Sequence, residues 1–191
     1  MTTLSFVSRR HIGHIAWGAS VFVLFSQQRL SAADKPITFD APASVTCIGQ
    51  NVEGEALQQA IIRAGVEPQY EQALDVKDLA DTKTLFLTIS AAPGIEAAAE
   101  LARANRLMDH CAKENILIVI VQIGGKPPRD AVSEQLIKAI VPKSNVIIVI
   151  PETDSDGLFN DLAQASGIPI RSARSKVFLP ELIKAAFGSG T

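Results

Sequence analysis

The chain has 191 residues, of which 47% are hydrophobic and 20% are charged, with 18 Lys and Arg against 20 Asp and Glu. This composition excludes a disordered chain and suits one domain with a buried core. A formal net charge of −2 without a basic cluster argues against binding to nucleic acid or to an anionic membrane surface, because both reward clustered Lys and Arg.

The first 33 residues have the pattern of a cleavable export signal. Arg9 and Arg10 form a charged start, Ile15 to Phe25 is apolar, and Ser31-Ala32-Ala33 fits a cleavage site of small residues. The apolar run is shorter than the roughly 20 residues of a membrane-spanning helix, so cleavage is favoured over a stable membrane span. We therefore expect a periplasmic or extracellular protein that begins near Asp34, with the secretory route slightly favoured over the twin-arginine route.

Removal of this signal leaves 158 residues with a net charge of −5, because the signal holds three Lys or Arg and no Asp or Glu. The exported chain keeps both cysteines, Cys47 and Cys111. Cys47 falls in the first predicted strand and Cys111 at the end of a long helix that leads to the opposite side of the sheet. A disulfide needs a Cα separation of about 4.4 to 6.8 Å, so we expect two buried free thiols.

Strands and helices alternate along the chain after an extended lead-in at 34–43, within a single domain predicted at 44–191. The predicted strands are 44–49, 68–74, 84–89, 116–121, 145–150 and 168–172. The predicted helices are 54–64, 95–114, 130–140, 157–165 and 180–187. The third, fourth and fifth strands are continuous apolar runs, as is typical of strands covered on both faces, whereas 68–74 is more polar and suits a sheet edge.

This alternation predicts a three-layer α-β-α sandwich with a mostly parallel sheet, either flavodoxin-like or Rossmann-like. In such folds ligands bind beyond the carboxyl ends of the strands, where the strand order reverses. The candidate ligand-binding residues at these ends are Gly49, Gln50, Asn51, Ser90, Gly94, Gly124, Gly125, Lys126, Glu152 and Asp154.

One segment at a strand end could hold a carboxylate or a phosphate. Gly124-Gly125-Lys126 and Arg129 offer backbone N–H groups and two cations just before a helix. The spacing matches neither a P-loop nor a dinucleotide fingerprint, and Pro127-Pro128 removes two donors. A tight turn between strand and helix is therefore the favoured interpretation.

A second segment, 152–157, resembles the start of a calcium-binding loop. Ala163 stands where that loop needs a bidentate glutamate, and a strand precedes the segment where a helix belongs, so we expect no metal site. Asp156 is instead predicted to cap the following helix.

Gln50 and Asn51 could offer amide groups to a neutral polar ligand, or could satisfy their own loop and helix; both interpretations stay open. Cys47 lies in an apolar strand without a nearby histidine, and His110 is expected at the opposite end of the sheet. Neither suits catalysis.

Three short motifs occur in the same order in a known family. Gly49-Gln50, Ile123-Gly124-Gly125 and Asp156-Gly157-Leu158-Phe159 resemble a bacterial family of exported α/β domains of unknown function, family 6305. The resemblance covers about 44–187 and implies an extracytoplasmic α/β fold without an assigned chemistry. The chain departs from the family at 90–96, which is shorter and lacks a glycine- and lysine-rich loop.

Three classes of function remain. The favoured one is a non-catalytic module, with no cofactor, that binds a small polar or anionic ligand or an envelope protein. An envelope enzyme could use Glu152 and Asp154 with Lys126, provided that both carboxylates point into a closed pocket. A structural subunit of an envelope assembly would expose an apolar patch and have no pocket.

Overall fold

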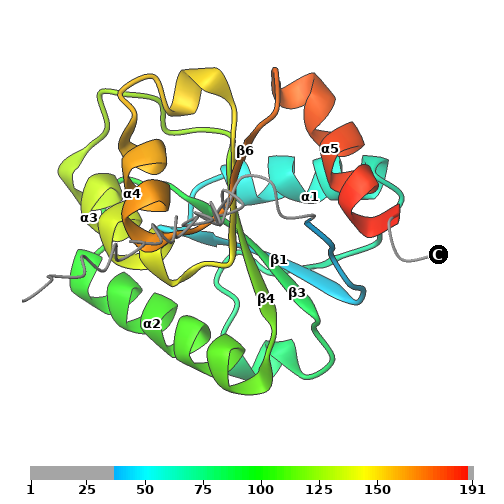
Figure 1. Ribbon diagram of the computed structural model, residues 1–191. Helices are drawn as coiled ribbons and strands as arrows, with labels where there is room; N and C mark the ends of the chain where they lie inside the picture. Colours follow the sequence, from blue (N-terminus) through cyan, green and yellow to red (C-terminus); the bar gives the residue numbers. More distant parts are fainter. Residues whose placement is uncertain (1–36, 189–191) are drawn as a thin grey trace, which may run out of the picture.

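The computed structural model describes residues 37–188 (Figure 1). The export signal predicted at 1–33 lies outside these residues. Within them, no helix combines the length and the apolar character needed to cross a bilayer.

A six-stranded sheet forms the centre of the molecule. Its strands are β1 (Ala43–Ile48), β2 (Gln69–Tyr70), β3 (Thr84–Ile89), β4 (Leu117–Gln122), β5 (Val146–Val149) and β6 (Ile170–Ser172). All neighbours pair in parallel, in the order β2-β1-β3-β4-β5-β6. This order, apart from the added β6, is the flavodoxin-like one, in which the strand order reverses between β1 and β3.

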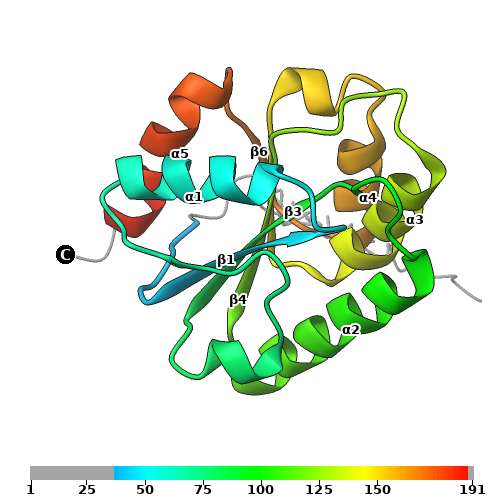
Figure 2. The ribbon, with the colours of Figure 1, turned by 180° about the vertical axis from the view of Figure 1, so that it is seen from behind.

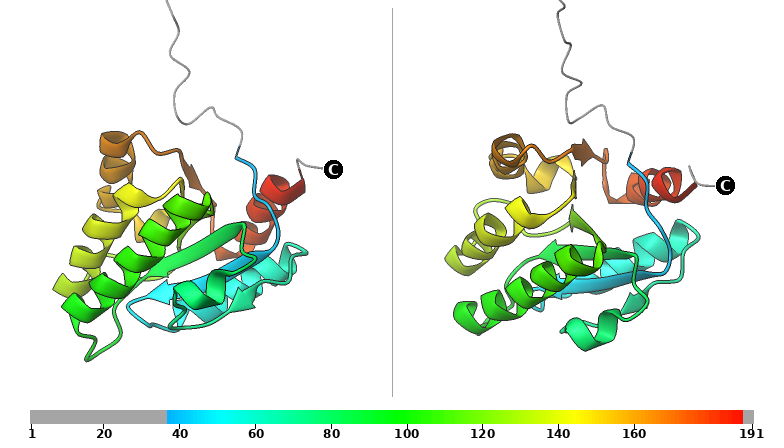
Figure 3. Two further views of the ribbon diagram at one scale, coloured as in Figure 1. Left: turned by 90° about the horizontal axis from the view of Figure 1, so that it is seen from below. Right: turned by 60° about the horizontal axis from the view of Figure 1, so that its bottom comes forward.

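Two helix layers cover this sheet. Helices α1 (Glu53–Arg63) and α5 (Leu179–Phe187) lie side by side on one face (Figure 2). Helices α2 (Ala97–Glu114), α3 (Ala131–Ile140) and α4 (Leu158–Ser166) cover the other face (Figure 1). Figure 3 shows the sheet between the two layers. The α/β fold predicted from the sequence is confirmed, and the three-layer sandwich agrees with it.

The apolar strand runs explain why both faces are covered. On β3, Phe86 packs in the cluster with α1 and α5, whereas Leu85 and Leu87 pack in the cluster with α2, α3 and α4. Successive side chains of a strand point to opposite faces, so a continuous apolar run needs two partner layers. Phe39, which precedes β1, adds to the first cluster and packs edge-on against Phe86 and Phe187, at centroid distances of 5.2 and 5.5 Å.

The edge strand is shorter than predicted. The pattern at 68–74 indicated seven residues, but β2 pairs with β1 only at Gln69 and Tyr70. The chain then leaves the edge, which carries Leu74 into the core, and a short 3-10 helix, Val76–Leu79, begins at a capping box made by Asp75. The capping box at Asp75 and the burial of Leu74 are more favourable than further pairing of β2 with β1 at the exposed edge of the sheet.

Both cysteines are buried and free, as predicted. Burial raises the pKa of the Cys111 thiol to about 12. This thiol therefore stays protonated in the helix-facing core at neutral pH.

Candidate functional site

The loops at the point of strand reversal bond to each other. The Ala92 N–H donates to the Gly49 carbonyl at 2.8 Å, and the Ser90 N–H donates to the Ile48 carbonyl at 2.9 Å. Gln50 and Ala91 form an isolated antiparallel bridge beyond these bonds. The carboxyl ends of β1 and β3 are thus joined by the chain itself.

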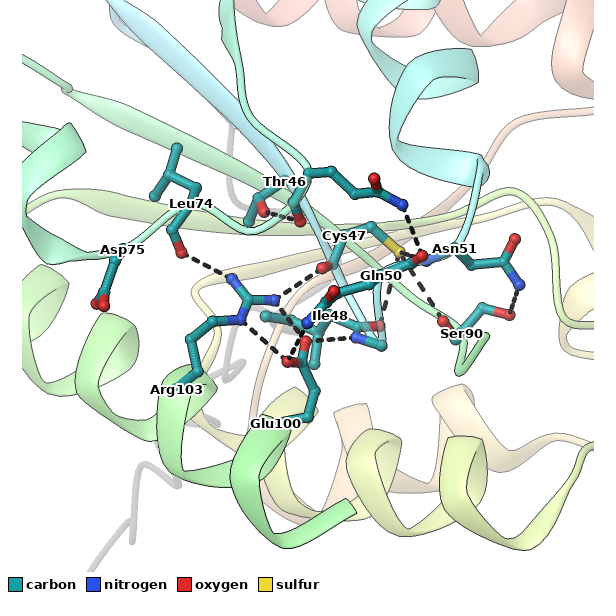
Figure 4. Close-up of polar contacts among 12 residues, drawn as sticks. Thr46, Cys47, Ile48, Gln50, Asn51, Leu74, Asp75, Ser90, Glu100 and Arg103 are labelled. Carbon is teal, nitrogen blue, oxygen red and sulfur yellow. Dashed lines mark hydrogen bonds and ion pairs between the residues drawn. The ribbon is translucent and has the colours of Figure 1, made fainter. Parts of the chain in front are cut away.

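A buried ion pair from α2 supports this junction (Figure 4). The Arg103 guanidinium donates to the Glu100 carboxylate at 2.5 Å, and both side chains are less than a tenth exposed. Glu100 in turn accepts the Gly49 N–H at 2.7 Å and the Gln50 side-chain amide at 3.2 Å. The candidate ligand residues Gly49 and Gln50 are therefore engaged by a carboxylate of their own chain.

Arg103 completes the cluster by donating to two backbone carbonyls, those of Leu74 at 2.7 Å and Cys47 at 2.9 Å. Burial alone raises the pKa of Glu100, but hydrogen bonds from Arg103, Gly49 and Gln50, with the charge of Arg103, outweigh it and hold this pKa below its usual value. Sequence reasoning missed the pair. Its signal was the spacing of Glu100 and Arg103, which share the helical stripe of the buried residues of α2.

Asn51 and Ser90 are joined by a hydrogen bond of 3.2 Å from the Asn51 amide to the Ser90 hydroxyl. The Asn51 side chain also accepts the Val52 N–H, and its backbone N–H donates to the Cys47 sulfur at 3.3 Å. Burial and the nearby Glu53 raise the pKa of Cys47, partly offset by hydrogen bonding, to about 11. A protonated buried thiol does not act as a nucleophile at neutral pH.

A pocket of about 350 Å³ lies one strand further along, beyond β4 and β5. Four of the candidate residues line this pocket: Gly124, Gly125, Lys126 and Glu152. Gly94, by contrast, is exposed in the loop before α2. The remaining lining residues are Ile123, Ile150, Thr153 and Lys176.

Glu53 forms part of the support behind this pocket. A Cβ at Gly124 would lie 2.2 Å from a Glu53 carboxylate oxygen, so the glycine leaves room for this side chain. The buried amide of Gln122 donates to the Gly124 carbonyl at 2.7 Å and holds the loop on β4. The other Glu53 oxygen is buried without a hydrogen-bond partner within residues 37–188.

Asp154 lines a separate pocket of about 330 Å³ with Ile170 and Arg171 from β6. Its carboxylate accepts the backbone N–H groups of Phe159 at 2.7 Å and Asn160 at 3.2 Å. Asp154 thus serves the first turn of α4. Glu152 is exposed and lines the other pocket, so the two carboxylates do not face Lys126 together.

Asp156 was predicted to cap α4, and its carboxylate does accept the N–H of Leu158, the first residue of α4, at 3.4 Å, although the N-cap position itself is Gly157. Its shorter hydrogen bond, of 2.5 Å, comes from Arg129 and is the main cause that lowers the pKa of Asp156. The Arg129 side chain is 3% exposed, bonds the Thr153 carbonyl and lies over the Phe159 ring at 5.4 Å. Arg129 therefore joins two loops of its own chain.

Replacement of Asp154 by alanine tests its role at α4. We expect Asp154→Ala to lower the free energy of unfolding by about 0.5 to 2 kcal/mol, because two N–H groups of the first helical turn lose their acceptor. Urea denaturation measures this loss. The exposed Glu152→Ala is the control and is expected to change stability by less than about 0.5 kcal/mol. Equal effects of the two substitutions would contradict the capping role.

Within residues 37–188, no three His, Cys, Asp or Glu side chains are grouped to hold a metal ion. Comparison with curated proteins and with solved structures finds no match. A family model, Domain of unknown function (DUF6305), matches residues 40–187, which include all six strands and the candidate residues. The resemblance seen in the sequence motifs is thereby confirmed, and the chain belongs to this uncharacterised domain family.

Proposed function

We propose that this domain is a non-catalytic module that binds a small anionic ligand beyond β4 and β5. The observation that carries the proposal is the pocket in which Lys126 and Lys176, from distant parts of the chain, line one cavity with Gly124 and Gly125. Two ammonium groups beside a glycine backbone favour a ligand with a negatively charged oxygen.

The distribution of carboxylates favours binding over catalysis. The enzyme alternative needs Glu152 and Asp154 opposite Lys126 in a closed pocket, but Asp154 is bonded to the backbone of α4 and lines a different cavity. The presence of a pocket also favours a ligand-binding module over a purely structural subunit of an envelope assembly, which would need an apolar patch but no cavity.

We place this module outside the cytoplasm, on the evidence of the export pattern in the first 33 residues. Expression of the full chain in a bacterial host is expected to yield a periplasmic product whose mass begins near Asp34. Fractionation followed by intact mass measurement checks this. A cytoplasmic product that retains Met1 would contradict the location and leave the binding proposal to be tested separately.

Native mass spectrometry of the exported protein tests binding itself. We expect an additional mass that is lost on denaturation, because the pocket binds its ligand noncovalently. A double variant, Lys126→Gln with Lys176→Gln, is expected to lack this mass. Lys113→Gln, at an exposed lysine near the end of α2, is the matched control and should retain it. A bare mass for the wild-type protein from its native envelope would contradict the proposal and favour a protein partner.

A further inference from the structure

Exposed apolar residues are next in sequence to residues at the pocket that Lys126 and Lys176 line. Among residues 37–188, the large apolar side chains that are exposed are Val52 at 71%, Val177 at 77% and Phe178 at 44%. Val177 and Phe178 directly follow Lys176, which lines the pocket. Single exposed apolar residues need no explanation, but a group beside a cavity indicates a binding surface.

Val52 is related to the same pocket through Glu53, the next residue in the sequence. The Glu53 carboxylate fills the space beside Gly124 in the pocket wall. Exposed apolar residues are therefore sequence neighbours of residues at this cavity in two segments, just before α1 and just before α5.

The charge of the lining limits the ligand further. Lys126 and Lys176 carry two positive charges and Glu152 one negative charge, and the Glu53 carboxylate lies directly behind Gly124 in the pocket wall. The Thr153 hydroxyl already bonds the carbonyls of Gln122 and Ile150, at 3.0 and 2.9 Å, which leaves the ammonium groups as the main side-chain donors. A singly charged group can lie between the two ammonium groups, whereas a doubly charged group would meet stronger repulsion from Glu152 and Glu53.

Within the proposed binding function, on which this inference rests, we propose that the ligand is a small carboxylate with an apolar tail, such as an acyl or aryl acid. The carboxylate lies between Lys126 and Lys176, and the tail extends along Val177 and Phe178. The volume of about 350 Å³ lies at the lower end of the range of about 300 to 1,000 Å³ for ligand pockets, which suits a short tail.

Isothermal titration of the exported protein, stripped of ligand, tests this class with octanoate, acetate, octylamine and inorganic phosphate. We expect octanoate to bind at least about tenfold more tightly than acetate or phosphate, because only octanoate combines one negative charge with an apolar tail. Octylamine has the same tail but a positive charge, and is expected not to bind.

Variants separate the two halves of the site. Lys176→Gln and Lys126→Gln are each expected to weaken octanoate binding about tenfold or more, because each removes a charge-assisted hydrogen bond. Val177→Ser and Phe178→Ser are expected to weaken it about threefold or more without changing the binding of acetate. Lys113→Gln is expected to bind like the wild-type protein, and thermal unfolding confirms that each variant is folded.

The outcomes distinguish this inference from the proposed function. Tighter binding of phosphate than of octanoate, lost in the lysine variants, would overturn the apolar carboxylate and leave anion binding intact. Binding to vesicles that contain phosphatidylglycerol, but not to octanoate, would make the apolar residues a membrane contact and also overturn the inference. Absence of binding to every anion would overturn both proposals.

Discussion

Replacement of Arg103 by methionine is expected to lower the free energy of unfolding by about 3 to 5 kcal/mol, because it leaves the buried Glu100 carboxylate without its cation. The substitution also removes the donors to the carbonyls of Leu74 and Cys47, so three segments lose their common partner. Urea denaturation followed by circular dichroism measures the loss.

Two variants serve as controls for this effect. Arg106→Met on the same helix breaks an exposed pair with Asp75 at 3.4 Å and is expected to cost at most about 1 kcal/mol. The double variant Glu100→Gln with Arg103→Met is expected to recover part of the stability, because no uncompensated charge remains. A loss as small for Arg103→Met as for Arg106→Met would show that the buried pair does not stabilise the junction.

The same pair gives the fold a dependence on pH. The folded state holds the pKa of Glu100 below its unfolded value, so the stability from its charged form is present above the unfolded pKa and is lost as the pH falls through the folded pKa. As the pH is lowered into the acid range, the free energy of unfolding of Glu100→Gln is therefore expected to fall less steeply than that of the wild-type protein.

Gly49→Ala is expected to lower the free energy of unfolding by about 2 to 6 kcal/mol. The residue has a φ of +95°, which strains any other side chain, and an added Cβ would lie 2.3 Å from the backbone carbonyl oxygen of Ser90. Backbone at the joined ends of β1 and β3 cannot move aside without breaking the Ala92 to Gly49 hydrogen bond. Chemical denaturation of the variant checks this value.

Gly94→Ala provides the matched control. Gly94 has a similar φ of +84°, but nothing lies within 4 Å of an added Cβ, so only the backbone strain remains. We expect a cost of about 1 to 3 kcal/mol. Equal losses at Gly49 and Gly94 would show that strain alone, and not the close approach of the two strand ends, makes Gly49 necessary.

The fold could be predicted because its pattern is local. Continuous apolar runs such as 84–89 and 116–121 indicate strands covered on both faces, and the intervening helices force parallel crossovers. The extent of β2 could not be predicted in this way. Its end depends on the capping box at Asp75 and on the burial of Leu74, which compete with pairing at the edge.

Only the tertiary structure showed which polar residues bond to other parts of the chain and which line a pocket. Asp154 and Asp156 are two residues apart and look equivalent in sequence, yet Asp154 accepts two N–H groups of the first turn of α4, whereas Asp156 accepts one at 3.4 Å and pairs with Arg129. The balance between capping and ion pairing depends on where the loop places each carboxylate, which the sequence pattern does not specify to within one or two residues.

By itself, the sequence determined the α/β class, the resemblance to an uncharacterised family and the strand ends at which polar residues gather, because periodicity and turn residues act over short distances. Only the tertiary structure decided that Glu100 and Arg103 are buried beneath the ends of β1 and β3, and that Lys176 joins Lys126 at one pocket. Lys126 and Lys176 lie far apart along the chain, and their proximity is a consequence of strand order and packing, which no local pattern records.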